Sequence, residues 1–178
     1  FFNFWESEIG GEEIYYIPGR DYIKIFYNDG PFCWYKISNT VLYNEYGFEI
    51  PSPEMIENSV CPDGFVGPPC GDFYDVIPYQ ERFWYRHFKV TEYYGKNCLN
   101  IENIRGALMD KKHFILVYKT GVDKSHQVIL NACRGFSDYS FKLYALDPNH
   151  LGFTTIGYRK FLEMVENGAV GYALEGRR

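Results

Sequence analysis

The sequence predicts an α+β fold in which N-terminal helices pack on a C-terminal antiparallel β-sheet. Three observations predict it: an apolar helical period in residues 34–42, three consecutive β-rich runs between residues 113 and 147, and a second helical period over residues 157–167. Helical and β-rich segments are grouped along the chain, which is typical of an α+β arrangement. A length of 178 residues suits one hydrophobic core, so we expect residues 1–178 to form a single domain.

The first helix is expected to begin at or just after Phe32. Apolar and small residues recur there at i, i+3, i+4, i+7 and i+8, namely Trp34, Ile37, Ser38, Val41 and Leu42. Gly47 can end this helix. A second, short helix is expected to begin at Ser52, a good N-cap, and to run through the sequence EMIEN. Residues 61–71, rich in Pro and Gly, are interpreted as a long loop.

The second half of the chain is expected to begin with a helix, IENIRGALMD, that Asn100 can cap. Three β-rich runs follow: HFILVYK (113–119), HQVILNA (126–132) and FKLYALD (141–147). The short loops between them contain Gly, Asp and Ser, so we expect neighbouring antiparallel strands. The segment GYRKFLEMVEN is amphipathic, and Gly168 can end it before a last strand, AVGYALEG.

Charge and hydropathy exclude several classes of protein. The net charge is −5 and Lys and Arg form no run, so we expect no phosphate-binding surface and no nucleic-acid partner. No stretch approaches 18 consecutive apolar residues, so we expect no membrane-spanning segment.

The aromatic-rich segment 79–94 is interpreted as core plus a strand, with an aromatic wall for a substrate as the alternative.

The five cysteines are an odd number, so at least one thiol is free. No CxxC pair or Cys/His cluster has the spacing of a zinc site, and we expect no metal and no cofactor. Cys61 and Cys70 flank a loop that a disulfide could close, but no dense disulfide framework is present. We therefore favour a cytoplasmic location, with secretion as the alternative. Cys61, Cys70, Cys98 and Cys133 are interpreted as packing residues or an incidental pair.

Cys33 is the candidate nucleophile. It would stand in the first turn of the first helix, where the partial positive charge of the helix N-terminus favours a thiolate. The unsatisfied N–H groups of that turn, above all the one on Cys33, could bind a developing oxyanion. The alternative interpretation is a buried thiol that only packs.

His126 and Asp147 are the candidate base and orienting group. His126 begins one predicted strand and Asp147 ends the next, directly before Pro148. If these strands form an antiparallel hairpin, the start of one lies beside the end of the other, and the two side chains meet. An acid next to an imidazole fixes its tautomer, and Asn149 is a rival for that role. The alternatives are an ordinary strand-end histidine and a turn-forming Asp-Pro. His87, His113 and His150 are expected at surfaces or interfaces.

The order of these residues resembles the papain-like cysteine peptidases. FCWYKISNTVLYNEYG resembles the Cys-Trp entry into the central helix of that superfamily. The later segments SHQVILN and LYALDPNHLG are similar to compact bacterial branches, such as the bacteriocin-processing double-glycine peptidases and secreted effector peptidases. The resemblance covers residues 25–175 and implies a central helix that begins at the nucleophile, a Cys33, His126 and Asp147 triad, and a protein or peptide substrate.

The chain departs from the papain-like pattern at the oxyanion donor. Those peptidases usually carry a Gln six positions before the nucleophile, where this chain has Tyr27. Asn28, one position later, is the candidate replacement, and the Tyr hydroxyl is another possible donor.

The segments that follow Cys33 also resemble the butirosin-biosynthesis acyltransferase family. Those proteins share the papain-like arrangement but pass an acyl group from a carrier-protein thioester to an amine. This resemblance implies an acyl carrier protein as the partner. A non-catalytic papain-like binding domain is the third interpretation.

Overall fold

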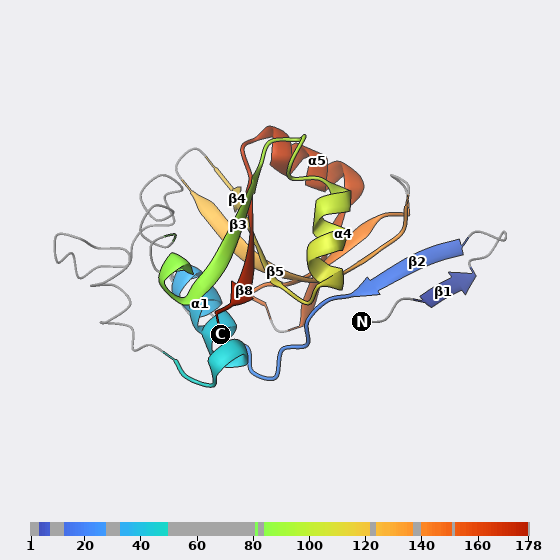
Figure 1. Cartoon of the computed structure of the whole chain (residues 1–178). Helices are drawn as coiled ribbons and strands as arrows, with labels where there is room; N and C mark the ends of the chain where they lie inside the picture. The colour runs from blue at the N-terminus through green and yellow to red at the C-terminus, as the bar shows by residue number, and fades with distance from the viewer. Residues whose placement is uncertain are drawn as a thin grey trace.

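The computed structural model of the chain describes residues 4–7, 13–27, 33–49, 81, 84–121, 124–136, 140–150 and 152–177 (Figure 1). Its elements in chain order are β1 (Phe4–Ser7), β2 (Glu13–Pro18), α1 (Cys33–Tyr46), β3 (Phe88–Tyr94), α4 (Ile101–Met109), β4 (His113–Lys119), β5 (Ser125–Arg134), β6 (Lys142–Leu146), β7 (Phe153–Gly157), α5 (Tyr158–Glu166) and β8 (Val170–Gly176). The fold is α+β, as predicted. The second helix predicted from Ser52 lies outside the described residues, as do Cys61 and Cys70.

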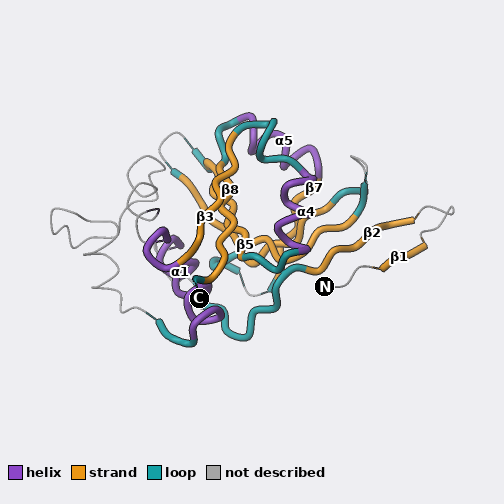
Figure 2. The backbone as a smooth tube through the Cα atoms, in the orientation of Figure 1, coloured by secondary structure: helices purple, strands orange, loops and turns teal. Residues whose placement is uncertain are grey.

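The strands of the described residues form one eight-stranded sheet in which every pairing is antiparallel. The main path runs β1-β2-β5-β4-β8-β3, with β6 paired to β5 and β7 paired to β6. The predicted antiparallel neighbours β4, β5 and β6 are confirmed. Although β8 comes last in sequence, it lies inside the sheet, between β4 and β3 (Figure 2).

The expectation of helices first and a purely C-terminal sheet was wrong. Two strands precede α1, and β2 pairs with the far end of β5, as in the pair Ile17 and Cys133. These partners lie more than 100 residues apart in the sequence, and local periodicity carries no information about such pairing. β3 falls within the aromatic-rich segment interpreted as core plus a strand, and it pairs with β8.

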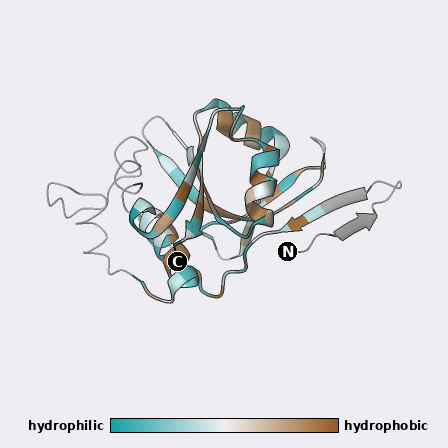
Figure 3. Ribbon diagram, viewed as in Figure 1, coloured by the Kyte–Doolittle hydropathy of each residue, from teal (hydrophilic) through white to brown (hydrophobic). Residues whose placement is uncertain are grey.

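The sheet is covered on both faces. Alternate residues of β4 point in opposite directions: Ile115 and Val117 pack with α1, whereas Phe114 and Leu116 pack with α4 and α5. α1 therefore lies on one face, and the other two helices lie on the opposite face (Figure 1). In Figure 3, apolar and polar residues alternate around these helices, as expected for helices that cover a sheet.

Helix ends follow the predicted signals, with one exception. Gly47 has φ +80° and donates its N–H to Tyr43, so it ends α1, and Asn100 caps α4 through the N–H of Asn103. α5 ends at Gly168 (φ +94°) in a Schellman motif, with the N–H groups of residues 168 and 169 bonded to residues 165 and 164. α4 ends in the same motif, but a lysine occupies the left-handed position.

Lys111 has φ 58°, a conformation that costs an L-residue about 1–2 kcal/mol. Its ammonium donates to the carbonyl oxygens of Pro18 (2.8 Å) and Gly19 (3.0 Å), and its own carbonyl accepts from Arg20 at 3.3 Å. A glycine would relieve the strain but would lose the side-chain bonds. Lys111 therefore joins the end of α4 to the chain that leaves β2.

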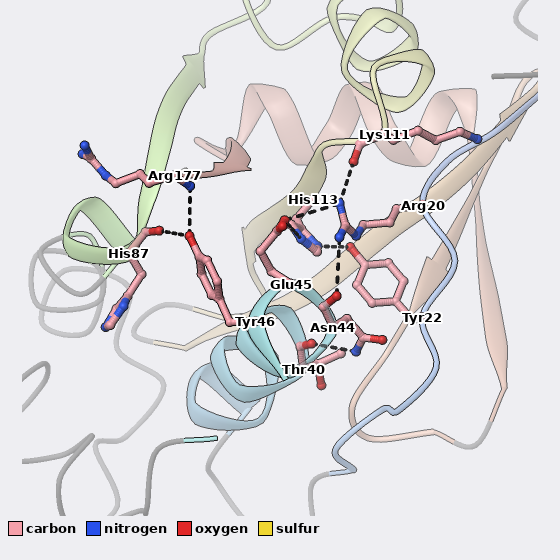
Figure 4. Close-up of polar contacts among 10 residues, drawn as sticks. All are labelled: Arg20, Tyr22, Thr40, Asn44, Glu45, Tyr46, His87, Lys111, His113 and Arg177. Atoms are coloured by element: carbon pink, nitrogen blue, oxygen red, sulfur yellow. Dashed lines mark hydrogen bonds and ion pairs between the residues drawn. The ribbon is translucent and has the colours of Figure 1, made fainter. Parts of the chain in front are cut away.

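A partly buried polar cluster, the α1 anchor, fixes the C-terminal end of α1 (Figure 4). It consists of Arg20, Tyr22, Glu45 and His113. Nε2 of His113 lies 3.0 Å from Oε1 of Glu45, Nδ1 lies 2.7 Å from the Tyr22 hydroxyl, and Arg20 lies 3.4 Å from the same glutamate oxygen. Because a carboxylate only accepts, Nε2–H donates to Glu45 and Nδ1 accepts from Tyr22. Burial lowers the pKa of His113, which suits this neutral tautomer.

Replacing Glu45 by Ala is expected to lower the free energy of unfolding by about 3 kcal/mol, because the buried His113 N–H loses its acceptor and Arg20 loses its counter-charge. Glu49→Ala is the matched control: Glu49 also pairs with a cation, Lys24 at 3.6 Å, but both side chains are half-exposed. We expect less than about 1 kcal/mol from it. Urea unfolding measures the free energy of unfolding of both variants. Equal losses would show that the α1 anchor stabilises the fold no more than an exposed ion pair does.

Candidate active site

Cys33 is the first residue of α1, where the sequence predicts the start of a helix. Its side chain is a free thiol, and the residue is 8% exposed. Trp34, the next residue, packs in the core between α1 and the sheet, so the helix start is held against the sheet. The first N–H groups of a helix have no partner within it, and those around Cys33 therefore form a potential anion site.

His126 and Asp147 meet, as the hairpin geometry predicts. β5 and β6 pair antiparallel with Ile129 opposite Leu146, so the start of β5 lies beside the end of β6. His126 Nε2 lies 2.6 Å from Oδ1 of Asp147. The same oxygen accepts the backbone N–H of Asn149 at 2.9 Å, which holds the carboxylate in place. The acid in contact with His126 is therefore Asp147, and its rival Asn149 supports that acid from the backbone.

The Cys33 thiol lies near the imidazole of His126 and contributes to the raised pKa of that histidine. Since Nε2 is engaged by Asp147, Nδ1 is the ring nitrogen left for the sulfur. Residues from α1, β5 and the end of β6 thus come together in the order thiol, imidazole and carboxylate. These side chains are largely buried: His126 is 12% exposed and Asp147 is 9% exposed.

The electrostatics favour an imidazolium between two acids. Burial alone would lower the pKa of His126, but the hydrogen bonds to Asp147 and Cys33, and their negative charges, raise it to about 9. Burial alone would raise the pKa of Asp147, but the hydrogen bonds from His126 and the Asn149 backbone lower it.

Tyr118 is a neighbour of this group that the sequence reasoning missed. It is the direct cross-strand partner of His126, and the two rings meet edge to face at 5.8 Å with an interplanar angle of 84°. Burial, followed by the charges of Asp147 and Cys33, raises the pKa of Tyr118 to about 12, so the phenol stays neutral. The available signal was register: once residues 113–119 and 126–132 pair as a hairpin, Tyr118 falls opposite His126.

The remaining sequence-predicted residues have mixed outcomes. Asn28, the candidate oxyanion donor, lies outside the described residues, and Tyr27 is exposed. His113, expected at a surface or an interface, is fully buried in the α1 anchor, because its two ring nitrogens are hydrogen-bonded to a hydroxyl and a carboxylate. Cys133 is buried, but Cys98, interpreted as a packing residue, is exposed on the turn before α4.

Other features of the described residues lie away from the thiol. A cavity of about 580 Å³ lies at the opposite end of α1, where Arg20, Glu45 and Lys111 contribute to its wall. No group of three or more His, Cys, Asp or Glu side chains in the described chain is arranged to hold a metal ion. Among the helices described, none has the length and apolar character needed to cross a membrane.

Comparison of the sequence with protein-family models gives no match, and a search of curated proteins gives none either.

Proposed function

We propose that this protein is a thiol-dependent acyl-transfer enzyme, and specifically a cysteine peptidase that hydrolyses a peptide or isopeptide bond. The observation that carries the proposal is the juxtaposition of Cys33, His126 and Asp147 at the start of α1, with His126 hydrogen-bonded to Asp147. A nucleophile, a base within hydrogen-bond reach and a third group that orients the base are the parts that covalent acyl transfer requires. The raised pKa of His126 also supports it, since perturbed groups gather at functional sites.

In the proposed first half-reaction, the Cys33 thiolate attacks the substrate carbonyl carbon and forms a C–S bond. The carbonyl oxygen becomes an oxyanion, for which the Cys33 N–H and Asn28 are the proposed donors. The His126 imidazolium gives its proton to the leaving amine as the C–N bond breaks, leaving a thioester on Cys33. Asp147 keeps Nε2 protonated and holds the ring so that Nδ1 faces the reacting atoms.

In the second half-reaction, neutral His126 takes a proton from water, which attacks the thioester and releases the acid. The sulfur leaves as a thiolate, and the imidazolium is restored. If an amine takes the place of water, the same steps transfer the acyl group instead. This acyltransferase reaction, with an acyl carrier protein as donor, is the second candidate, and Tyr27 in place of the usual glutamine favours it.

An activated ester tests the proposal without knowledge of the substrate. We expect p-nitrophenyl acetate to give a burst of nitrophenol and an acetylated peptide that contains Cys33, identified by mass spectrometry. Adding glycinamide separates the two candidates, because a peptidase partitions to acetate and an acyltransferase to the acetylated amine. Acetylation confined to the exposed thiol of Cys98 would instead favour the non-catalytic binding domain.

A further inference from the structure

We propose that the cavity at the C-terminal end of α1 binds a small organic anion that carries a phosphate or a carboxylate group. Its volume of about 580 Å³ lies within the range of about 300–1,000 Å³ that is typical of sites for whole small molecules. This inference does not depend on the proposed function, because the cavity lies at the end of the helix opposite to the candidate nucleophile. Five basic residues contribute to its wall: Arg20, Lys89, Lys111, Lys112 and Arg177.

The sheet brings these basic residues together, although the sequence has no run of Lys or Arg. β3 and β8 pair with Lys89 opposite Glu175, and β4 and β8 pair with His113 opposite Leu174. The start of β3, the residues just before β4 and the end of β8 therefore meet at one edge of the sheet. The C-terminal end of α1 and the chain that leaves β2 complete the wall.

The positive charges of the wall exceed its negative charges. Glu45, Asp110 and Glu175 bring three negative charges against five positive ones. Oε1 of Glu45 lies 3.4 Å from Nη1 of Arg20. Oε1 of Glu175 lies 4.0 Å from Nζ of Lys89. With these two pairs set against each other, Asp110 remains against three cations, which leaves an excess of two positive charges.

The three remaining cations, Lys111, Lys112 and Arg177, form no ion pair within the described part of the chain. Lys111 donates to two backbone carbonyl oxygens at 2.8 and 3.0 Å, and the Arg177 guanidinium donates to two others at 3.1 and 3.0 Å. A carbonyl oxygen satisfies a donor but does not neutralise a charge. α1 and α4 also end at this wall and each adds about half a negative charge, so an excess of about one positive charge remains for a ligand.

Arg20 provides donors for that ligand. Its side chain is 26% exposed, and Figure 4 shows its guanidinium between Glu45 and the Lys111 carbonyl. Its contacts to Glu45, to the Lys111 oxygen and to the Asn44 oxygen are 3.4, 3.3 and 3.4 Å, all longer than the usual N–H···O distance of about 2.9–3.0 Å. A guanidinium has five N–H donors in a planar fork that matches phosphate and carboxylate oxygens. Arg20 can therefore bind a ligand oxygen while it stays in the α1 anchor.

Pyrophosphate and citrate are the probes that test the site, since one presents phosphate oxygens and the other carboxylates. In 1H–15N NMR spectra of the whole chain at low salt, we expect at least one probe to shift the amide signals of residues 110–112 and 174–177, with a Kd of about 1 mM or below. The probe with the lower Kd identifies the preferred group. Sodium chloride at equal ionic strength is the control for screening, and we expect it to leave these signals in place.

Lys112→Gln is expected to raise the Kd about threefold or more, and Asp110→Asn is expected to lower it, because each changes the charge of the wall. Lys142→Gln is the charge-matched control: Lys142 is exposed on β6, away from this wall, and the Kd should not change. The proposal is overturned if neither probe shifts these amides up to about 20 mM. Shifts centred on the first turn of α1, or equal effects of Lys112→Gln and Lys142→Gln, would overturn it as well.

Discussion

Replacing Cys33 by Ala is expected to reduce the turnover of p-nitrophenyl acetate to background, a loss of about 1,000-fold or more. The variant lacks the only atom that can form the thioester in the proposed reaction. Because alanine is small and fits the space that the thiol leaves, the fold should persist, with far-ultraviolet circular dichroism unchanged. Burst amplitude and steady-state rate measure the loss.

Cys133→Ala is the control matched for burial, because Cys133 is a fully buried free thiol on β5 that has no role in the proposed reaction. We expect it to keep the burst and the turnover. If Cys33→Ala retained turnover within a few-fold of the unmodified protein, the proposed enzyme would lose its nucleophile and the proposal would fail.

Replacing His126 by Ala is expected to slow the alkylation of Cys33 by iodoacetamide at about pH 6.5 at least tenfold, because the imidazolium that favours the thiolate is lost. The pKa of His126 is raised to about 9, so the imidazolium is present below that pH and disappears as the pH rises through it. The pKa of Asp147 is lowered, so its carboxylate stays ionised to a lower pH than that of an ordinary aspartate. The difference between the two proteins should therefore be large near neutral pH and vanish above about pH 10.

His150→Ala is the matched control for this measurement. His150 also lies near Asp147, with Nε2 at 4.0 Å from Oδ2, but its side chain is 65% exposed. We expect its effect on the Cys33 alkylation rate to stay within about twofold, because an exposed pair interacts weakly. If the alkylation rate of Cys33 were the same in His126→Ala and in the unmodified protein at every pH, the proposed thiol-imidazole pair would be contradicted.

The features predicted from the sequence are those with local causes. A helix start at Cys33 and its end at Gly47 follow from periodicity and a glycine in the left-handed position, and β4 has the predicted bounds of residues 113–119. The contact between His126 and Asp147 was predictable for the same reason, because a hairpin with a short loop determines which residues meet at its edge.

The features that were missed depend on residues distant in the chain. β2 is a strand because it pairs with the end of β5, and β7 is a strand because it pairs with β6. His113 is buried because Glu45, on another element, provides an acceptor, and no pattern around residue 113 shows this. Tyr118 has none of the chemistry that marks a nucleophile, a base or an acid, so only its register opposite His126 indicates its place at the site.

The position of β8 inside the sheet has a consequence for the protein during its synthesis. β8 is the last strand described. Among the described strands, β3 pairs only with β8, and β8 also pairs with one edge of β4. Cys33, His126 and Asp147 are therefore all synthesised before β8, the strand that completes their sheet. Until residues 170–176 leave the exit tunnel, the edge of β4 that β8 covers lacks this partner strand, and an unpaired strand edge favours aggregation.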